Sequence, residues 1–575
     1  MLEFGVVNLL VLAIYLLGIT VIGSFAARWI GGISDFIMPR RFGKSMLIMH
    51  SFGTGTHSDQ AVSVARKSYT NGLSGIWYQW LWLFATPFYW LIAPMMRRTR
   101  AVTIGDIFEA RFGRSASIMY ALLGMAMMLS IIGLMLKGSA AVISAATGQA
   151  LSPDVCIGVV TVLFVIYGAI GGLSGAIVTD FIQGIMTIVF SFLLLPSVLA
   201  EVGWIDGMRA TIDDPQMFSL VVPGEIGAFY ITMLALNGLI GIIAQPHALG
   251  NCAAGRTEAE GQVGWMFGNM LKRLCTVAWS LTGVAAIAYF AQRGIDPDTL
   301  DPDLIYGMMA HEELPDLLPG LLGLFVASLL ATVMSSCDSF MVASSGLFTE
   351  NLYKNILPGR SDRHYIWVAR AAALVLVASS VLYAYWLKDV LEGLKIFWKL
   401  APMAGIALWM GFLWKRMTVQ GAWASALSAV ATWWVTSQAW FIERLAGTGL
   451  SEQLQFVVSG EDGLAMYLPW QMVFYLVVGV GVGVVVSLLT RRTSQDKLDH
   501  FYALLRTPIR PGEEHDVQDA CTLPEDAETP PEETLLPGTD IYLPKPSTRG
   551  IVGFVVGWAC VAAIIAIVYY IAVAG

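Results

Sequence analysis

The chain has 575 residues, of which 56% are hydrophobic and 13% are charged, and its formal net charge is −8. A soluble domain carries about 25% charged residues, so these charges are too few to cover a soluble surface of this size. The composition indicates a polytopic membrane protein embedded in a lipid bilayer. The six cysteines show neither metal-ligand spacing nor a paired framework, and the sequence carries no nucleic-acid-binding signature.

Apolar stretches recur along the chain, each close to the roughly 20 residues that a helix needs to cross a bilayer. They predict an all-α fold with 14 transmembrane helices. The predicted spans lie near residues 4–27, 43–71, 74–96, 116–146, 153–172, 175–201, 226–253, 262–291, 317–353, 364–387, 391–413, 418–441, 468–490 and 550–573.

Basic residues are distributed unevenly between the connections. They follow the first, third, ninth, eleventh and thirteenth spans, as Arg97, Arg98 and Arg100 do after the third. Cytoplasmic loops carry the excess of Lys and Arg in membrane proteins, so these connections are predicted to be cytoplasmic. An even number of spans then places both termini outside. We expect a multi-pass protein of a cell membrane, specifically a bacterial inner membrane.

The second predicted span is interrupted by the stretch "SFGTGTHSDQ". Gly53 and Gly55 weaken the helix, and His57, Asp59 and Gln60 follow directly. Unwound backbone at membrane depth is tolerated where it lines a cavity or is buried in protein. A glycine groove for helix packing is the alternative, but it does not account for the three polar residues together.

The seventh predicted span is interrupted in the same way, in "AQPHALGNCAAG". Pro246 removes a backbone hydrogen bond and is expected to break the helix. Gln245, His247 and Asn251 surround it. A single histidine in such a place is often a satisfied structural residue, so a structural role for His247 stays open.

The two interrupted helices stand five spans apart, which is typical of an inverted-repeat transporter with its binding site at the membrane midplane. Two five-helix units would then be preceded by one helix and followed by three. The predicted division is 1–42 (first helix and loop), 43–202 (first repeat), 203–225 (outer loop), 226–414 (second repeat), 415–491 (two helices), 492–549 (acidic, Pro-rich cytoplasmic linker) and 550–575 (last helix). The linker composition predicts a largely disordered segment.

The ninth span contains the polar stretch "ATVMSSCDSFMVASS". Thr332, Ser335, Ser336 and Ser339 recur at helical spacing and form one stripe, with Asp338 on the same side. Hydroxyl and carbonyl oxygens are ligands that small hard cations prefer. Packing of small residues would explain the serines alone, whereas an aspartate at this depth needs a cation, a proton or a partner.

Four motifs resemble the sodium/solute symporter family: "GGLSGAIVTDFIQ", the ninth-span stretch "FVASLLATVMSSCDSFMVASSGLFTENLY", "GFLWKRMTVQGA" and, for its proline-type members, "AQPHALGNCAAG". The resemblance covers roughly residues 1–490 and implies a LeuT-like five-plus-five inverted repeat. It also implies sodium as the co-transported ion. Asp180, in the first motif, is either a helix-start acid favoured by the helix dipole or part of the ion site.

The resemblance implies a sodium site between the first interrupted helix and the ninth span. Its ligands would be the carbonyls of Gly53, Thr56 and Thr332 and the hydroxyls of Ser335 and Ser336. A second cation is implied between Asp180, Ser339 and the position of Asp338, where some members have a hydroxyl and the choline-transporting branch has an aspartate. Two carboxylates there can hold a second sodium or share a proton.

The predicted activity is sodium-coupled import of a small polar solute by alternating access. Asp59 and nearby aromatic rings favour a zwitterionic or cationic amine, such as an amino acid, while a sugar or a monocarboxylate is the alternative. A solute sensor without transport is an alternative of another class. No enzymatic motif is visible, and no pattern indicates an oligomeric state. The candidate solute contacts are His57, Asp59, Gln60, Trp77, Tyr78, Trp80, Asn237, Gln245 and His247.

Overall fold

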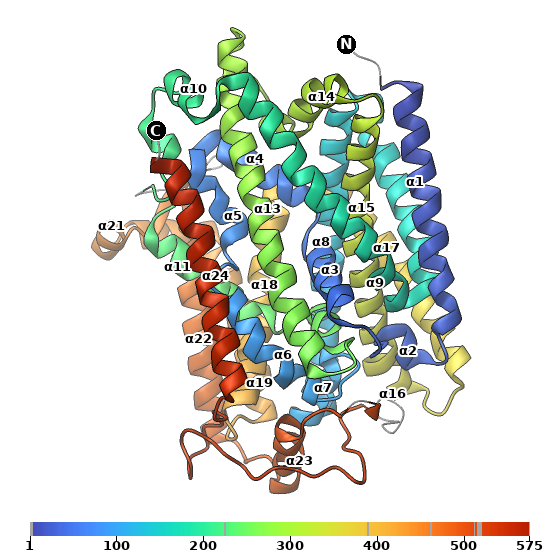
Figure 1. Cartoon of the computed structure of the whole chain (residues 1–575). Coiled ribbons are helices and arrows are strands. Elements are labelled where there is room, and N and C mark those ends of the chain that lie inside the picture. Colours follow the sequence, from blue (N-terminus) through green and yellow to red (C-terminus); the bar gives the residue numbers. More distant parts are fainter. Residues whose placement is uncertain are drawn as a thin grey trace.

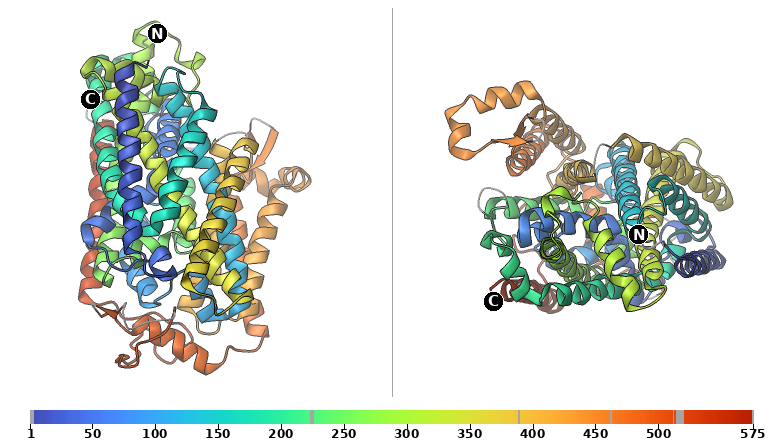
Figure 2. Two further views of the ribbon diagram at one scale, coloured as in Figure 1. Left: turned by 90° about the vertical axis from the view of Figure 1, so that its right-hand side faces the viewer. Right: turned by 90° about the horizontal axis from the view of Figure 1, so that it is seen from above.

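The computed structural model describes residues 4–222, 226–387, 390–460, 463–510, 512–513 and 520–573. Its helices stand side by side in one bundle, and the two described ends of the chain lie at the same end of it (Figure 1; Figure 2). Within the described residues, nine helices are long and apolar enough to cross a membrane. The chain is therefore a multi-pass membrane protein, and the count of 14 spans stays a prediction.

Both predicted helix breaks are confirmed. The second span consists of α3 (Lys44–Gly55) and α4 (Ser58–Asn71), joined by two extended residues, Thr56 and His57. The seventh span consists of α11 (Ala228–Ile242) and α12 (Ala248–Ala253), separated by a turn that contains Pro246. Glycines and proline thus end these helices where their weak helix propensity predicts it.

The fifth and sixth predicted spans are the two arms of α9 (Pro153–Val202), which meet at Gly172. Gly172 has a φ of 56°, and a Cβ there would lie 2.5 Å from the carbonyl oxygen of Phe36. Tyr167 and Thr179, on opposite sides of this glycine, both approach Gly23 of α1 (Val6–Phe25). The chain therefore folds back at Gly172, and this turn requires a glycine because it has a positive φ and no room for a side chain.

The most enclosed helices are α13 (Glu258–Gln292) and α15 (Leu321–Gly346). In their apolar windows 83% and 89% of residues are buried, against 22% for α1 and 28% for α24 (Thr548–Val573). Polar residues on α13 and α15 consequently face protein rather than lipid, which makes them the candidates for a site. The last turns of α15 continue into a π-helical stretch, η6 (Leu347–Tyr353).

The other elements surround this core or connect its helices. They are η1 (Ala26–Trp29), α2 (Ile33–Ile37), η2 (Gly72–Ile76), α5 (Trp77–Trp80), η3 (Thr86–Phe88), α6 (Tyr89–Arg98), α7 (Ile104–Phe112), α8 (Arg114–Ala146), α10 (Trp204–Thr211), η4 (Pro215–Phe218), η5 (Pro297–Thr299), α14 (Ile305–Leu317), α16 (Lys354–Ile356), α17 (Asp362–Trp386), α18 (Val390–Leu413), α19 (Val419–Thr436), α20 (Ala439–Ala446), α21 (Gly449–Leu454), α22 (Leu468–Leu489) and α23 (Gln495–Arg506). A hairpin of β1 (Val457–Gly460) and β2 (Gly463–Met466) precedes α22.

The described part of segment 492–549 is ordered against the bundle, so the prediction of a largely disordered linker is wrong there. Helix α23 lies across the end of the bundle opposite the chain termini (Figure 1). Its Phe501 and Tyr502 are buried, and Tyr502 donates a hydrogen bond of 2.9 Å to the carbonyl of Gly411. The buried Arg100 pairs with Glu513 at 2.5 Å. These contacts tie the segment to α18 and to the loop after α6.

Candidate functional site

The predicted sodium ligands meet where the break after α3 faces α15. The hydroxyl of Ser336 lies 3.1 Å from the carbonyl oxygen of Gly53 and 3.2 Å from that of Thr332. All three residues are buried. Two carbonyls and one hydroxyl therefore converge on one point, which is the oxygen-rich environment that a small hard cation prefers.

The other two predicted ligands lie at the edges of this group. Thr56 and Thr332 line one cavity with an empty volume of about 280 Å³, and the buried hydroxyl of Thr56 has no hydrogen-bond partner among the described residues. Ser335 instead donates its hydroxyl hydrogen to Asp180. The group is thus partly assembled, and Ser335 connects it to the carboxylate behind it.

Asp180 has a partner that the sequence interpretation missed. Its carboxylate lies 2.6 Å from Nδ1 of His50 on α3, and the same ring nitrogen lies 3.2 Å from the hydroxyl of Thr54. Both Asp180 and His50 are fully enclosed. The bonds that hold Asp180 therefore come from His50 and Ser335, whereas the sequence suggested Asp338 as its companion.

Asp338 and Ser339 are adjacent and buried on α15, and their side-chain oxygens have no hydrogen-bond partner among the described residues. A Cβ added to Gly168 of α9 would lie 3.1 Å from the Cβ of Asp338, so the first arm of α9 packs closely here. A buried carboxylate without a donor is costly unless it gains a proton or a cation. These two residues fit a second cation by their chemistry.

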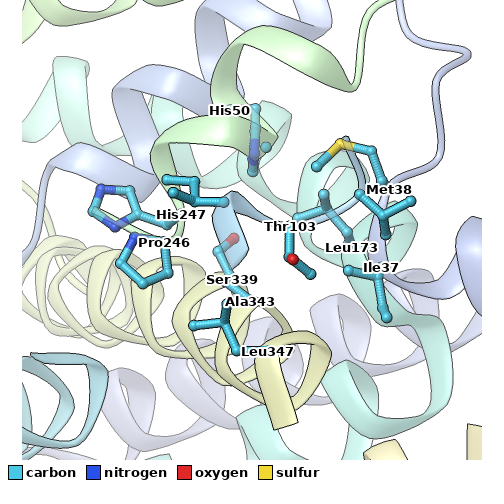
Figure 3. A pocket seen from close by; sticks show the side chains of 13 residues that line it. Ile37, Met38, His50, Thr103, Leu173, Pro246, His247, Ser339, Ala343 and Leu347 are labelled. Carbon is cyan, nitrogen blue, oxygen red and sulfur yellow. The ribbon is translucent and has the colours of Figure 1, made fainter. Parts of the chain in front are cut away.

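A cavity of about 380 Å³ lies beside these residues, between α3, α15 and the break after α11 (Figure 3). His50, His247 and Ser339 line it, together with the apolar residues Ile37 and Leu347. The ring of His247 packs against that of Phe340 in a tilted arrangement, with ring centroids 4.3 Å apart, and its buried Nδ1 has no described partner. His247 therefore has an apolar packing contact and an available polar atom.

Three predicted solute contacts next to the first helix break, His57, Asp59 and Gln60, are in contact with one another. The two ring nitrogens of His57 contact Asp59 and Gln60, the latter at 2.8 Å. His57, Gln60, Gln245 and His247 all line a larger cavity of about 550 Å³. The structure thus brings both helix breaks to one cavity, although Asp59 lies behind His57 rather than at its wall.

Four predicted solute contacts lie away from this cavity. The indole nitrogens of Trp77 and Trp80 donate to backbone carbonyls at 2.7 and 3.2 Å, and Tyr78 packs against Trp398. Asn237 donates to the carbonyl of Trp398 at 2.8 Å. These side chains hold helices together, and the aromatic rings at the cavity are instead Trp82, Tyr89, Trp265, Phe340 and Phe397.

Sequence reasoning also missed the most strongly charged part of the cavity wall. Lys272 and Arg273 of α13 line it, as does Asn269 one turn away. Lys272 donates to the carbonyl of Gly55 at the end of α3. Two adjacent cations in the middle of a buried span were the available signal, because charges at that depth mark functional sites.

Two helices broken beside one cavity, together with a cluster of carbonyl and hydroxyl oxygens next to it, define the class of secondary membrane transporters. The sequence matches the model of the sodium:solute symporter family over residues 36–428, and the chain belongs to that family. It is therefore a sodium-coupled symporter, and sodium is the ion that it co-transports.

The chain aligns with curated relatives over most of their length. The high-affinity proline transporter PutP of Bacillus subtilis is 26% identical over 507 residues, which is 84% of this chain and 98% of the relative. The osmoregulated proline transporter OpuE of the same organism is 25% identical, covering 84% and 95%. The sodium/pantothenate symporter of Haemophilus influenzae is 22% identical, covering 68% and 82%.

Solved structures show the same fold. A Na⁺-coupled sialic acid symporter in a substrate-bound, outward-open state superposes with a TM-score of 0.67 at 20% identity, covering 86% of this chain and 99% of the other. A nucleobase-cation-symport-1 family transporter in a closed conformation has a TM-score of 0.51 at 10% identity, covering 81% and 98%. At these identities the likeness concerns the arrangement of the helices.

Proposed function

We propose that the protein imports an amino acid or a related small polar solute together with sodium, and that both bind beside the break between α3 and α4. The observation that carries the ion site is the hydroxyl of Ser336, 3.1 Å from the Gly53 carbonyl and 3.2 Å from the Thr332 carbonyl. Sodium would take its place among these oxygens, with Thr56 and Ser335 completing the shell. Asp180, Asp338 and Ser339 would hold a second cation or a proton.

The solute would occupy the cavity of about 550 Å³ between the two breaks, in contact with His57, Gln60, Gln245 and His247. Proline, the solute named for the two Bacillus subtilis relatives, is small and polar, which suits the polar lining of this cavity. The proposal also includes the five-plus-five repeat, the 14 spans, the segment boundaries given above and the placement of both termini outside. With the termini outside, α23 would lie on the cytoplasmic face.

Transport is driven in this proposal by the sodium gradient. One sodium ion moving down a potential of 100 mV provides about 2.3 kcal/mol, which corresponds to roughly 50-fold accumulation of a neutral solute. Proteoliposomes that contain the purified protein should accumulate radiolabelled L-proline or another amino acid only under an inward sodium gradient. Equal uptake in sodium and choline buffers would refute the coupling.

A further inference from the structure

The solute cavity has a charged wall on one side only. Lys272 and Arg273 project from α13 into it, with exposed fractions of 4% and 1%. The described residues that line the cavity include no aspartate or glutamate. Because a buried cation is costly without a compensating charge, this side of the cavity favours an anionic group on whatever enters it.

The protein itself engages one side of the Arg273 guanidinium, while its buried Nε has no hydrogen-bond partner among the described residues. The guanidinium donates to the carbonyl of Gln79 at 2.9 Å and lies 6.0 Å from the ring centroid of Trp82. A carbonyl and an aromatic face are the usual partners of a structural arginine. Arg273 therefore fixes α5 against α13 and adds positive charge to the cavity.

The Lys272 ammonium also lies near the Trp82 ring, 5.6 Å from its centroid, but it makes few hydrogen bonds. The ammonium has three donors, and within the described chain the carbonyl of Gly55 is the hydrogen-bond acceptor that it contacts. No carboxylate of the described residues lies within 4.0 Å of its nitrogen, and Asp59 is engaged with His57. The end of α3 thus anchors a lysine whose remaining donors are available at the cavity wall.

We propose that Lys272 binds a carboxylate of the transported solute, and that the solutes are carboxylated molecules rather than cationic amines or neutral polyols. The inference rests on the proposed function, because it assigns a chemical group of the solute to the same cavity. It selects among the classes that the sequence left open: amino acids and monocarboxylates are retained, while purely cationic amines and sugars are excluded.

The first test compares matched ligands on the purified full-length protein in sodium buffer by isothermal titration calorimetry. The probes are the twenty proteinogenic amino acids, pantothenate, propionate and lactate, each beside its amide, with choline and myo-inositol as charge controls. The tightest ligand is expected to be a carboxylate, and its amide should bind at least about 10-fold more weakly, as loss of a charged hydrogen bond predicts. A tighter amide, choline or inositol, or no binding by any carboxylate, overturns the inference.

The second test assigns the effect to Lys272. Lys272→Met keeps the length of the side chain and removes the charge, so carboxylate affinity should fall by about 10- to 100-fold while the affinity for the amide stays within about 3-fold. The matched control is Lys137→Met on α8, because the Lys137 ammonium also donates to a backbone carbonyl, that of Leu387, away from the cavity. Equal losses for carboxylate and amide, or an equal effect of the control, contradict the assignment.

Two further measurements separate this inference from the proposed function. The sodium-induced rise in melting temperature should persist in Lys272→Met, which shows that the variant folds and that its ion site is intact. If carboxylate selectivity depends on Lys272 but uptake needs no sodium gradient, the symport proposal fails and the solute assignment stands. If uptake needs sodium but selectivity ignores the carboxylate, the solute assignment fails alone.

Discussion

Removal of the Ser336 hydroxyl is the most direct test of the proposed ion site. Without sodium, Ser336→Ala loses one neutral hydrogen bond shared by the carbonyls of Gly53 and Thr332, at 3.1 and 3.2 Å. Such a bond contributes about 0.5–1.5 kcal/mol to stability. With sodium bound, the same oxygen would face a cation, and an interaction with a charged group is worth about 1.5–3 kcal/mol. The substitution should therefore weaken sodium binding more than it destabilises the fold.

The expected size of the effect is a rise of about 10- to 100-fold in the sodium concentration that gives half-maximal uptake. The assay is initial uptake into proteoliposomes across a sodium titration, with melting temperatures measured without sodium beside it. Ser345→Ala is the matched control, because Ser345 is also buried on α15 and donates within its own helix, to Val342 at 2.9 Å. An unchanged sodium dependence in Ser336→Ala, or the same change in Ser345→Ala, would refute the reasoning.

Two further predictions follow from local geometry. Gly53→Ala places a new Cβ 2.7 Å from the hydroxyl oxygen of Ser335, so sodium-driven uptake should be lost. Gly55→Ala is the control: the atom nearest to its new Cβ is 3.6 Å away, so uptake should be largely retained. Glu513→Gln leaves the buried guanidinium of Arg100 without its counter-charge, so the melting temperature should fall, consistent with the about 3–5 kcal/mol cost of breaking a buried pair. Asp526→Asn, in an exposed pair, is the control and should leave the melting temperature nearly unchanged; equal shifts in both would contradict this account.

The parts of the fold that were predictable are those with a local cause. Gly53, Gly55 and Pro246 weaken or block a helix by their own chemistry, so both breaks were visible in the sequence. The stripe on α15 was visible for a similar reason, because helical spacing alone places its hydroxyls on one face. Its meeting with Gly53 depended on a tertiary contact, which the family resemblance supplied and helical periodicity could not.

The remaining residues of the site depend on a tertiary contact or carry a charge at membrane depth. The partnership of His50 with Asp180 joins α3 to α9 across 130 positions of sequence, and periodicity carries no information about such a pair. Lys272 was predictable from the sequence, because a lysine in the middle of a buried span is as costly as the aspartate at position 338. Trp77 and Trp80 donate to backbone carbonyls, because an indole nitrogen is satisfied as well by a carbonyl as by a ligand, and their contact with the solute stays a prediction.

The described part of the linker illustrates the limit of composition. Its proline and acidic content predicted disorder, yet Leu498, Phe501, Tyr502 and Leu505 recur at helical spacing and bury one face of α23. An amphipathic helix of this kind gains its stability from packing against the bundle, which average hydropathy does not register. The local pattern was therefore a better guide than the composition of the whole segment.

The end of α3 lies between the carboxylates near the ion site and the lysine of the solute cavity, and this placement relates ion binding to solute binding. The carbonyl of Gly53 faces Ser336 and the carboxylates beyond it, while the carbonyl of Gly55 accepts from Lys272. A single residue, Thr54, therefore separates a carbonyl on the anionic side from a carbonyl on the cationic side. A cation drawn to the first and an anion drawn to the second would fix the same short segment of backbone, so each would favour the conformation that the other needs. Because such coupling is reciprocal, the factor by which sodium strengthens solute binding must equal the factor by which the solute strengthens sodium binding.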